Sequence, residues 1–142
     1  MNPCPCGHYP DMNRCRCTPA QVMQYLGRIS QPLLDRLDLC AEVSPVDFEG
    51  LSSGQKGEST QTIRERVICA QDIQRERYKI EGIQFNGELS GAQIEKYCKM
   101  EKDARQLLKM AFQNMPFSAR AYHRILKVAR TIADMEATES IH

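Results

Sequence analysis

Apolar residues recur at three- and four-residue steps along much of this chain, a spacing that places them on one face of an α-helix. The clearest case runs from residue 119 to residue 136, and Ser118, just before it, can cap the helix. Its predicted buried stripe consists of Tyr122, Ile125, Leu126, Ala129, Ile132 and Ala133. A second side carries the basic residues Arg120, His123, Arg124, Lys127 and Arg130. The pattern therefore predicts an amphipathic helix with a dense basic face.

Further helices are predicted upstream. One extends from residue 60 to about residue 79, capped by Ser59 or Thr60. Its inner side is marked by Ile63, Val67, Ala70 and Gln74. Ser90 and Gln93 form a capping box for a short helix, and residues 101–115 form another that stops at Pro116. Together these elements predict an all-α domain over residues 58–142.

Residues 1–50 show a different pattern. Thr18 can cap a helix that has Pro19 at its first position, an arrangement that suits both residues. Apolar and polar residues then alternate over 37–43, as in a short strand closed by Pro45. A stretch rich in Gly, Ser and Pro follows. We therefore predict a small α/β domain over 1–50, a linker over 51–57 and a mainly α chain as a whole.

Composition is that of an ordinary globular protein. The 142 residues are 42% hydrophobic and 26% charged. The net charge is +1 at pH 7, so any basic binding site must be local. No apolar run approaches the length of a membrane span, and the N-terminus has no apolar signal region. We therefore expect a cytoplasmic protein without a membrane partner.

Four of the seven cysteines crowd into the first 17 residues, in a Pro- and Gly-containing loop: Cys4, Cys6, Cys15 and Cys17. In a cytosolic chain such crowding favours a metal over disulfides, and four thiolates around one structural zinc ion would order this loop. The spacing is C-x-C instead of the more usual C-x-x-C, and His8 is an alternative to one thiol. Reduced thiols without metal, and disulfides, are the other interpretations. Three further cysteines stand singly in apolar segments and are predicted to be buried: Cys40, Cys69 and Cys98.

Two arginines stand out by their positions. Arg120 falls in the first turn of its predicted helix, where the helix dipole disfavours a cation, and this suggests an anion nearby. A solvated basic face is the alternative. Arg36 lies between Asp35 and Asp38. A local salt bridge to either carboxylate is as good an interpretation of this spacing as a role in binding. The chain contains no Gly-x4-Gly-Lys-Ser/Thr phosphate loop and no supported Ser-His-Asp arrangement.

Three segments carry a family resemblance when they are taken together. They are 2–7 with Cys15 and Cys17, then 29–39 (Ile-Ser-Gln-Pro-Leu-Leu-Asp-Arg-Leu-Asp-Leu), and 118–124 (Ser-Ala-Arg-Ala-Tyr-His-Arg). In this order they closely resemble the C-terminal part of the magnesium-chelatase-like AAA+ ATPases, specifically the YifB/ComM branch. The resemblance is weakest between about residues 45 and 100. It implies the end of an AAA+ core, followed by the helical lid bundle of that core, with Met1 at an internal position.

The resemblance also implies roles for individual residues. Asn2 resembles the sensor-1 residue, which would orient the water that attacks the γ-phosphate. Arg36 resembles the arginine finger that reaches the ATP of a neighbouring subunit, and Arg120 resembles the sensor-2 arginine that contacts the γ-phosphate in cis. The four clustered cysteines match this branch too, although many chelatase subunits lack them. The remaining basic residues of the last helix have no such assignment and suit a solvated face, a subunit interface or a DNA contact.

The function implied by the resemblance is that of a motor. The intact protein would form a ring, as a hexamer, bind ATP and Mg²⁺, and couple hydrolysis to remodelling of a partner. For ComM-like proteins that partner is branched DNA during recombination in natural transformation. The alternatives are a chelatase-type motor that acts on a protein partner, and a free-standing zinc-binding interaction module. Because the Walker A and B motifs are absent here, we expect this chain alone to be inactive as an ATPase.

Overall fold

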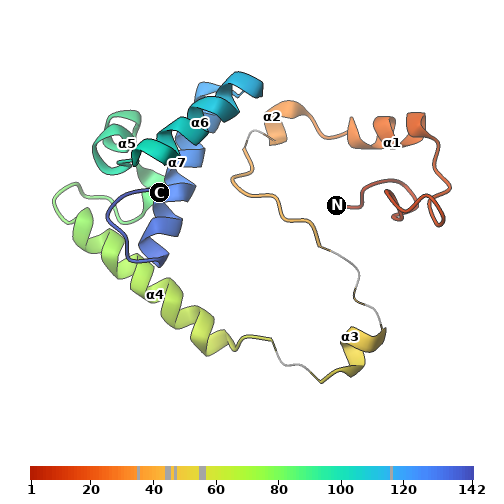
Figure 1. The fold of residues 1–142 in the computed structure, drawn as a ribbon, viewed down its shortest axis with the longest axis horizontal. Coiled ribbons are helices and arrows are strands. Elements are labelled where there is room, and N and C mark those ends of the chain that lie inside the picture. The colour runs from red at the N-terminus through yellow and green to blue at the C-terminus, as the bar shows by residue number, and fades with distance from the viewer. Residues whose placement is uncertain (35, 44–45, 47, 55–56, 116) are drawn as a thin grey trace. The chain divides into compact units, whose positions relative to one another are not determined.

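The computed structural model describes residues 1–34, 36–43, 46, 48–54, 57–115 and 117–142. These residues divide into two compact units, Met1–Leu39 and Cys40–His142. The described chain is mainly helical, which confirms the predicted fold class (Figure 1). Asp35, Pro45 and Pro116, which enter the predictions above, lie outside the described residues, as do two positions of the predicted linker, 55 and 56. The domain boundaries at 50 and 58 remain predictions.

The first unit consists of the cysteine-rich loop followed by α1 (Pro19–Leu26) and α2 (Gln31–Leu34). The predicted start of α1 is confirmed, because Thr18 and Gln21 form a capping box. The Thr18 N–H donates to Gln21 Oε1 at 2.9 Å, and the Gln21 N–H donates to Thr18 Oγ1 at 3.3 Å. Val22 is the buried residue of this helix. The loop thus ends in a helix whose first turn is held by its own side chains.

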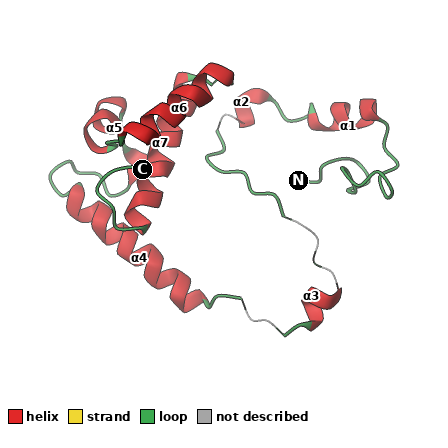
Figure 2. Cartoon of the chain, viewed as in Figure 1, coloured by secondary structure: helices red, strands yellow, loops and turns green. Residues whose placement is uncertain are grey.

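The strand predicted over 37–43 is not formed. The described residues around it are exposed and irregular, with Leu39 exposed to 75% and Val43 to 88%. A β-strand needs a neighbour to satisfy its backbone N–H and C=O groups. The part of the chain that the structure describes offers this segment no such neighbour, and no strand is drawn in Figure 2. The alternating pattern is present, but it lacks the partner that would turn it into a sheet.

The second unit contains α3 (Phe48–Ser52), α4 (Thr60–Arg77), the 3₁₀ turn η1 (Asn86–Glu88), α5 (Gly91–Tyr97), α6 (Lys102–Asn114) and α7 (Ala119–Met135). The predicted caps are confirmed. Ser59 accepts from the Thr62 N–H at 3.1 Å, and Ser118 accepts from the Ala121 N–H at 3.1 Å. The short helix α3 falls in the Gly- and Ser-rich stretch and was not predicted.

The core of this unit lies where α4, α5 and η1 pack against α7. Its buried members are Tyr78, Leu89, Ile94, Cys98, Leu126, Ala133 and Ile141. The C-terminus joins this core, because the Ile141 N–H donates to Lys99 O and the Glu101 N–H donates to Ile141 O, both at 2.9 Å. Burial of a large aliphatic side chain such as Leu126 stabilises the fold by about 1.5–3 kcal/mol.

Some residues of the predicted inner faces are not buried. In α4 only Ala70 and Gln74 are buried, while Ile63 and Val67 are each exposed to 43%. In α7 the predicted stripe includes Ile132, which is exposed to 51%. The buried positions of α4 lie in its C-terminal half, and the described residues of this unit leave the N-terminal half exposed.

Candidate functional site

The first half of the cysteine loop is a tight turn around Cys4 and Cys6. The Gly7 N–H donates to Cys4 O at 3.1 Å, and the Tyr9 N–H donates to Cys4 Sγ at 3.4 Å. Gly7 has a φ of +81°, a left-handed conformation that strongly favours glycine. The turn therefore directs the Tyr9 N–H at the sulfur of Cys4.

The second half of the loop returns to the first through a turn at Asp11. The Asp11 carboxylate accepts from the Asn13 N–H at 3.0 Å, and the Cys15 N–H donates to Asp11 O at 2.7 Å. Cys17 lies immediately before the capping residue of α1. The turn and the helix start together place the second pair of cysteines beside the first.

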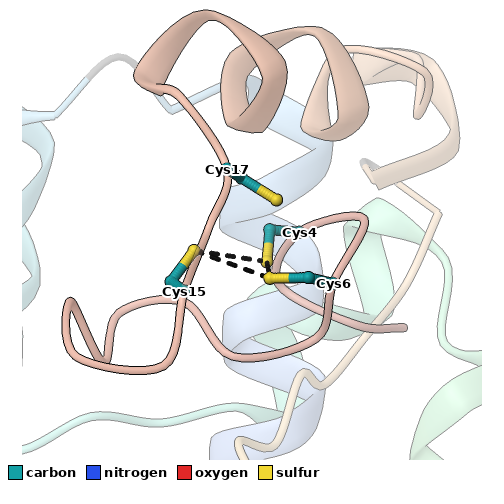
Figure 3. Close-up of side chains that lie close together, drawn as sticks. All are labelled: Cys4, Cys6, Cys15 and Cys17. Atoms are coloured by element: carbon teal, nitrogen blue, oxygen red, sulfur yellow. Dashed lines mark hydrogen bonds between the residues drawn. The ribbon is translucent and has the colours of Figure 1, made fainter.

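The four side chains meet at one point (Figure 3). The sulfur of Cys4 lies 3.4 Å from that of Cys6 and 3.8 Å from that of Cys15, and the Cys6 and Cys15 sulfurs are 3.7 Å apart. All four sulfurs, including that of Cys17, lie within 4.8 Å of one another. In a tetrahedron with zinc–sulfur bonds of about 2.3 Å, the sulfurs stand about 3.8 Å apart. The donor set and its spacing therefore fit zinc.

The surroundings of the sulfurs shift the pKa values of the four thiols in opposite directions. Backbone hydrogen bonds from His8 and Arg16, together with the Cys4 thiol, lower the pKa of Cys6 to about 6. The Cys6 backbone lowers the pKa of Cys17, but burial and the sulfurs of Cys6 and Cys4 outweigh it and raise this pKa to about 12. Neighbouring thiols thus oppose full ionisation of the cluster, and a divalent cation would remove that opposition.

A metal held here would be structural. The set of four thiol ligands is closed, with no position left for a reacting water. His8, the alternative ligand, is exposed and does not belong to the group of side chains that converge. All seven cysteines are free of disulfides. Of the three single cysteines predicted to be buried, only Cys98 is buried. Cys40 lies in an exposed irregular segment, and Cys69 lies on an exposed side of α4.

The residues with implied nucleotide roles are all exposed. Asn2 begins the cysteine loop and Arg36 follows α2, both in the first unit. Arg120 is the second residue of α7, in the other unit. Arg120 forms no ion pair with any residue that the structure describes, so its guanidinium remains available at the N-terminal end of the helix.

Comparison with known sequences assigns the family. The profile described as "Magnesium chelatase, subunit ChlI C-terminal" matches residues 57–142, and that described as "Magnesium chelatase, subunit ChlI" matches residues 1–51. The chain is 44% identical to the YifB protein of Salmonella typhimurium and 41% identical to the competence protein ComM of Haemophilus influenzae. The chain belongs to the magnesium-chelatase-like family, in its YifB/ComM branch.

The match to these YifB/ComM relatives covers nearly all of this chain but only part of each relative. Each of the two alignments covers 99% of this chain and 27% of the relative. A Mycobacterium bovis protein is 34% identical over 139 residues, with 98% of this chain and again 27% of the relative covered. The chain therefore spans about a quarter of the length of the curated relatives it matches.

One member of the basic face of this YifB/ComM-branch chain belongs to its interior. Arg130 is 0% exposed, and its guanidinium donates to Asp134 Oδ1 and to the backbone carbonyls of Thr138 and Glu139. This position cannot serve a solvated face or a DNA contact, which corrects that part of the sequence interpretation. The hydrogen bonds of the buried Arg130 guanidinium instead join α7 to the C-terminal turn.

Asp134 is the centre of a polar network that the sequence analysis missed. Arg77 reaches its carboxylate from α4, with Nη1 2.9 Å from Oδ2, and Asn86 Nδ2 donates to the same oxygen at 2.8 Å. Burial raises the pKa of Asp134, but the hydrogen bonds from Arg77 and Asn86 outweigh it and lower this pKa overall. The i, i+4 spacing of Arg130 and Asp134 was the visible signal in the sequence.

None of the helices in the described chain is sufficiently long and apolar to cross a bilayer.

Proposed function

We propose that this chain forms the end of the AAA+ core and the helical lid of a ring-forming ATPase that remodels branched DNA. The observation that carries the proposal is Arg120, an exposed arginine on the first turn of α7 without an ion pair among the described residues. A cation is unfavourable there unless an anion compensates it. In a magnesium-chelatase-like ATPase that anion would be the γ-phosphate of ATP.

Arg120 would sense the nucleotide from the lid. A guanidinium donates in a fork that matches phosphate oxygens, and the backbone N–H groups at the start of α7 add to the attraction for an anion. The hydrogen bonds from Arg120 and the attraction of the helix N-terminus would both strengthen as charge spreads over the transferred phosphoryl group. Because Arg120 is part of a 17-residue helix, a contact with phosphate would fix the position of that helix.

Arg36 and Asn2 would act from the core. Arg36 is exposed just after α2, where a guanidinium can extend to the nucleotide of a neighbouring subunit in a ring. Hydrolysis would then depend on oligomerisation, as in a hexamer. The Asn2 side chain would orient the attacking water. Mg²⁺, bound together with ATP, would neutralise phosphate charge, and zinc on the four clustered cysteines would keep the loop that begins with Asn2 ordered.

The choice of branched DNA as the remodelled partner rests on sequence similarity to a competence protein. The Haemophilus influenzae relative carries the name competence protein ComM, and 41% identity extends over 142 residues. A cytoplasmic ring that moves along branched DNA accords with that name. A chelatase-type motor on a protein partner is the alternative within the same family.

The test is made on an intact protein that carries this chain together with a complete nucleotide-binding core. Arg120→Ala should lower the ATP turnover number by about a hundredfold, because a preorganised donor to the transition state is lost. Arg120→Lys should recover only part of the rate, since ammonium lacks the fork. Arg64→Ala, an exposed arginine on α4, is the matched control. Equal turnover in Arg120→Ala and the control would contradict the proposal.

A second candidate is a zinc-binding interaction module without nucleotide chemistry. The convergence of four cysteine sulfurs within 4.8 Å supports it, since this feature needs no ATP. The two candidates differ in one measurement. Under the ATPase proposal, remodelling of a four-way DNA junction by the intact protein stops when ATP is replaced by a non-hydrolysable analogue. Under the module proposal, partner binding is the same with either nucleotide.

A further inference from the structure

The helix α6 (Lys102–Asn114) is amphipathic, yet none of its residues is buried. Ala104 and Leu108 are half-buried against the core. Leu107 and Met110 are exposed to 70% and 50%, respectively. Amphipathic helices of this length normally bury their apolar face. The apolar surface of α6 is therefore only partly covered by the described residues of the second unit.

A hollow lies between α6 and α7, where Phe112 and Tyr122 approach each other with ring centres 5.6 Å apart. Its volume is about 290 Å³. It is lined by Met100, Arg105, Leu108, Lys109, Phe112 and Tyr122. We call this hollow the α6 groove. Its lining combines apolar and aromatic side chains with two cations, and its volume lies just below the range of about 300–1,000 Å³ that is typical of ligand pockets.

The cations of the α6 groove extend along the helix. A second hollow, of about 490 Å³, is lined by Lys102, Arg105, Gln106, Lys109, Met110 and Gln113. Arg105 and Lys109 line both hollows. Lys102, Arg105 and Lys109 stand at i, i+3 and i+7, so they share one side of α6. None of these three forms an ion pair within the described ranges of the chain.

The aromatic rings argue against single-stranded nucleic acid as the occupant. Single-stranded nucleic acids bind by stacking bases on aromatic faces. Phe112 is in contact with Phe117, with ring centres 5.0 Å apart, and with Tyr122, so its ring is engaged within the protein. Aliphatic side chains need no ring face and can rest against Met100 and Leu108.

We propose that the α6 groove docks an acidic, amphipathic segment of a partner protein. Its apolar side chains would cover Leu108, Met100 and the edge of Phe112, as an amphipathic helix does in an apolar groove. Its carboxylates would pair with Arg105 and Lys109, which gives the groove charge selectivity. This inference goes beyond the proposed ATPase function and does not depend on it.

The test uses fluorescence anisotropy with the 142-residue chain and a labelled helical peptide. The peptide carries leucines at i, i+3, i+4 and i+7 and glutamates between them. Arg105→Glu and Lys109→Glu should each weaken its binding by about fivefold, in line with an exposed ion pair. Arg64→Glu, on α4 and outside both hollows, should leave the affinity unchanged. Circular dichroism of each variant verifies the fold.

A charge swap provides the second measurement. The Arg105→Glu/Lys109→Glu chain should bind a peptide in which lysines replace the glutamates, and should bind it more tightly than the unaltered chain does. Three results would overturn the proposal. They are no binding of the acidic peptide, equal loss of binding in Arg64→Glu, or a single-stranded oligonucleotide that binds through Arg105 and Lys109 in place of the peptide.

Discussion

Arg130 and Asp134 lie one turn apart on α7, and both are shut off from solvent, with exposed fractions of 0% and 1%. Arg130 Nε donates to Asp134 Oδ1 at 3.1 Å, while Arg77 reaches the same carboxylate from α4. The other Arg130 donors go to the carbonyls of Thr138 and Glu139. The pair therefore joins α4, α7 and the C-terminal turn through groups whose hydrogen bonds are satisfied.

Removal of the shared carboxylate should destabilise the second unit strongly. Asp134→Ala leaves Arg130 buried without its counter-charge, and we expect the free energy of unfolding to fall by about 3–5 kcal/mol. Urea unfolding followed by circular dichroism measures this change. Asp72→Ala is the matched control, because Asp72 forms an exposed pair with Arg75 at 3.2 Å and should cost at most about 1 kcal/mol. Similar losses in both variants would refute the central role of Asp134.

Acid sensitivity should depend on Glu81. Hydrogen bonds from Lys96, Tyr97 and Gln93 lower the pKa of Glu81 from 4.5 to about 2. The folded state thus holds the carboxylate in its charged form, so its contribution to stability is complete above pH 4.5 and is lost as the pH falls toward 2. In Glu81→Gln, the free energy of unfolding should depend less on pH between 4.5 and 2 than it does in the unaltered chain. In Glu95→Gln, an exposed control on α5, the pH dependence should be that of the unaltered chain.

Zinc should order the first unit only. We expect one zinc ion per chain, lost in Cys15→Ser and retained in Cys40→Ser, which alters an exposed single cysteine. Chelation should broaden or shift the amide resonances of 1–30, because the loop loses the ligand bonds that offset its ordering entropy. The resonances of α4 and α7 should stay in place. Elemental analysis and ¹H–¹⁵N spectra test both statements, and equal loss of helicity in the two units would contradict the prediction.

The role of Arg36 should appear in mixed rings. In an intact protein with a complete nucleotide-binding core, Arg36→Ala should abolish turnover when present in every subunit. Mixing Arg36→Ala subunits with subunits whose phosphate loop is inactivated should restore part of the activity, because an arginine acting in trans can serve the intact site next to it. Activity that stays absent at every mixing ratio would assign Arg36 to its own subunit or to the fold.

The chain by itself should not hydrolyse ATP. It contains no Gly-x4-Gly-Lys-Ser/Thr sequence to cradle the phosphates. We expect phosphate release by the purified 142-residue chain to equal the buffer blank. Turnover that follows the chain through successive purification steps would show that nucleotide chemistry resides here after all.

Much of the local structure was predictable because its causes are local. The caps Thr18, Ser59 and Ser118 and the Ser90–Gln93 capping box act within four residues of the helix ends they stabilise, so the sequence alone indicates them. The C-x-C pairs likewise indicated a metal site, because a loop poor in apolar residues needs another source of order. The segments that match the family were short and contiguous.

Other features depend on contacts between segments distant in the chain, and only the tertiary structure decided them. Arg130 stands on the same basic face as Arg120 in the sequence pattern, yet one is buried and the other exposed. The difference arises because Arg77, 53 positions before Arg130, and the C-terminal turn meet around Asp134. The alternating segment 37–43 shows the reverse case, since its pattern suits a strand but none of the residues that the structure describes pairs with it. Periodicity establishes which residues share a face, whereas burial of that face depends on what packs against it.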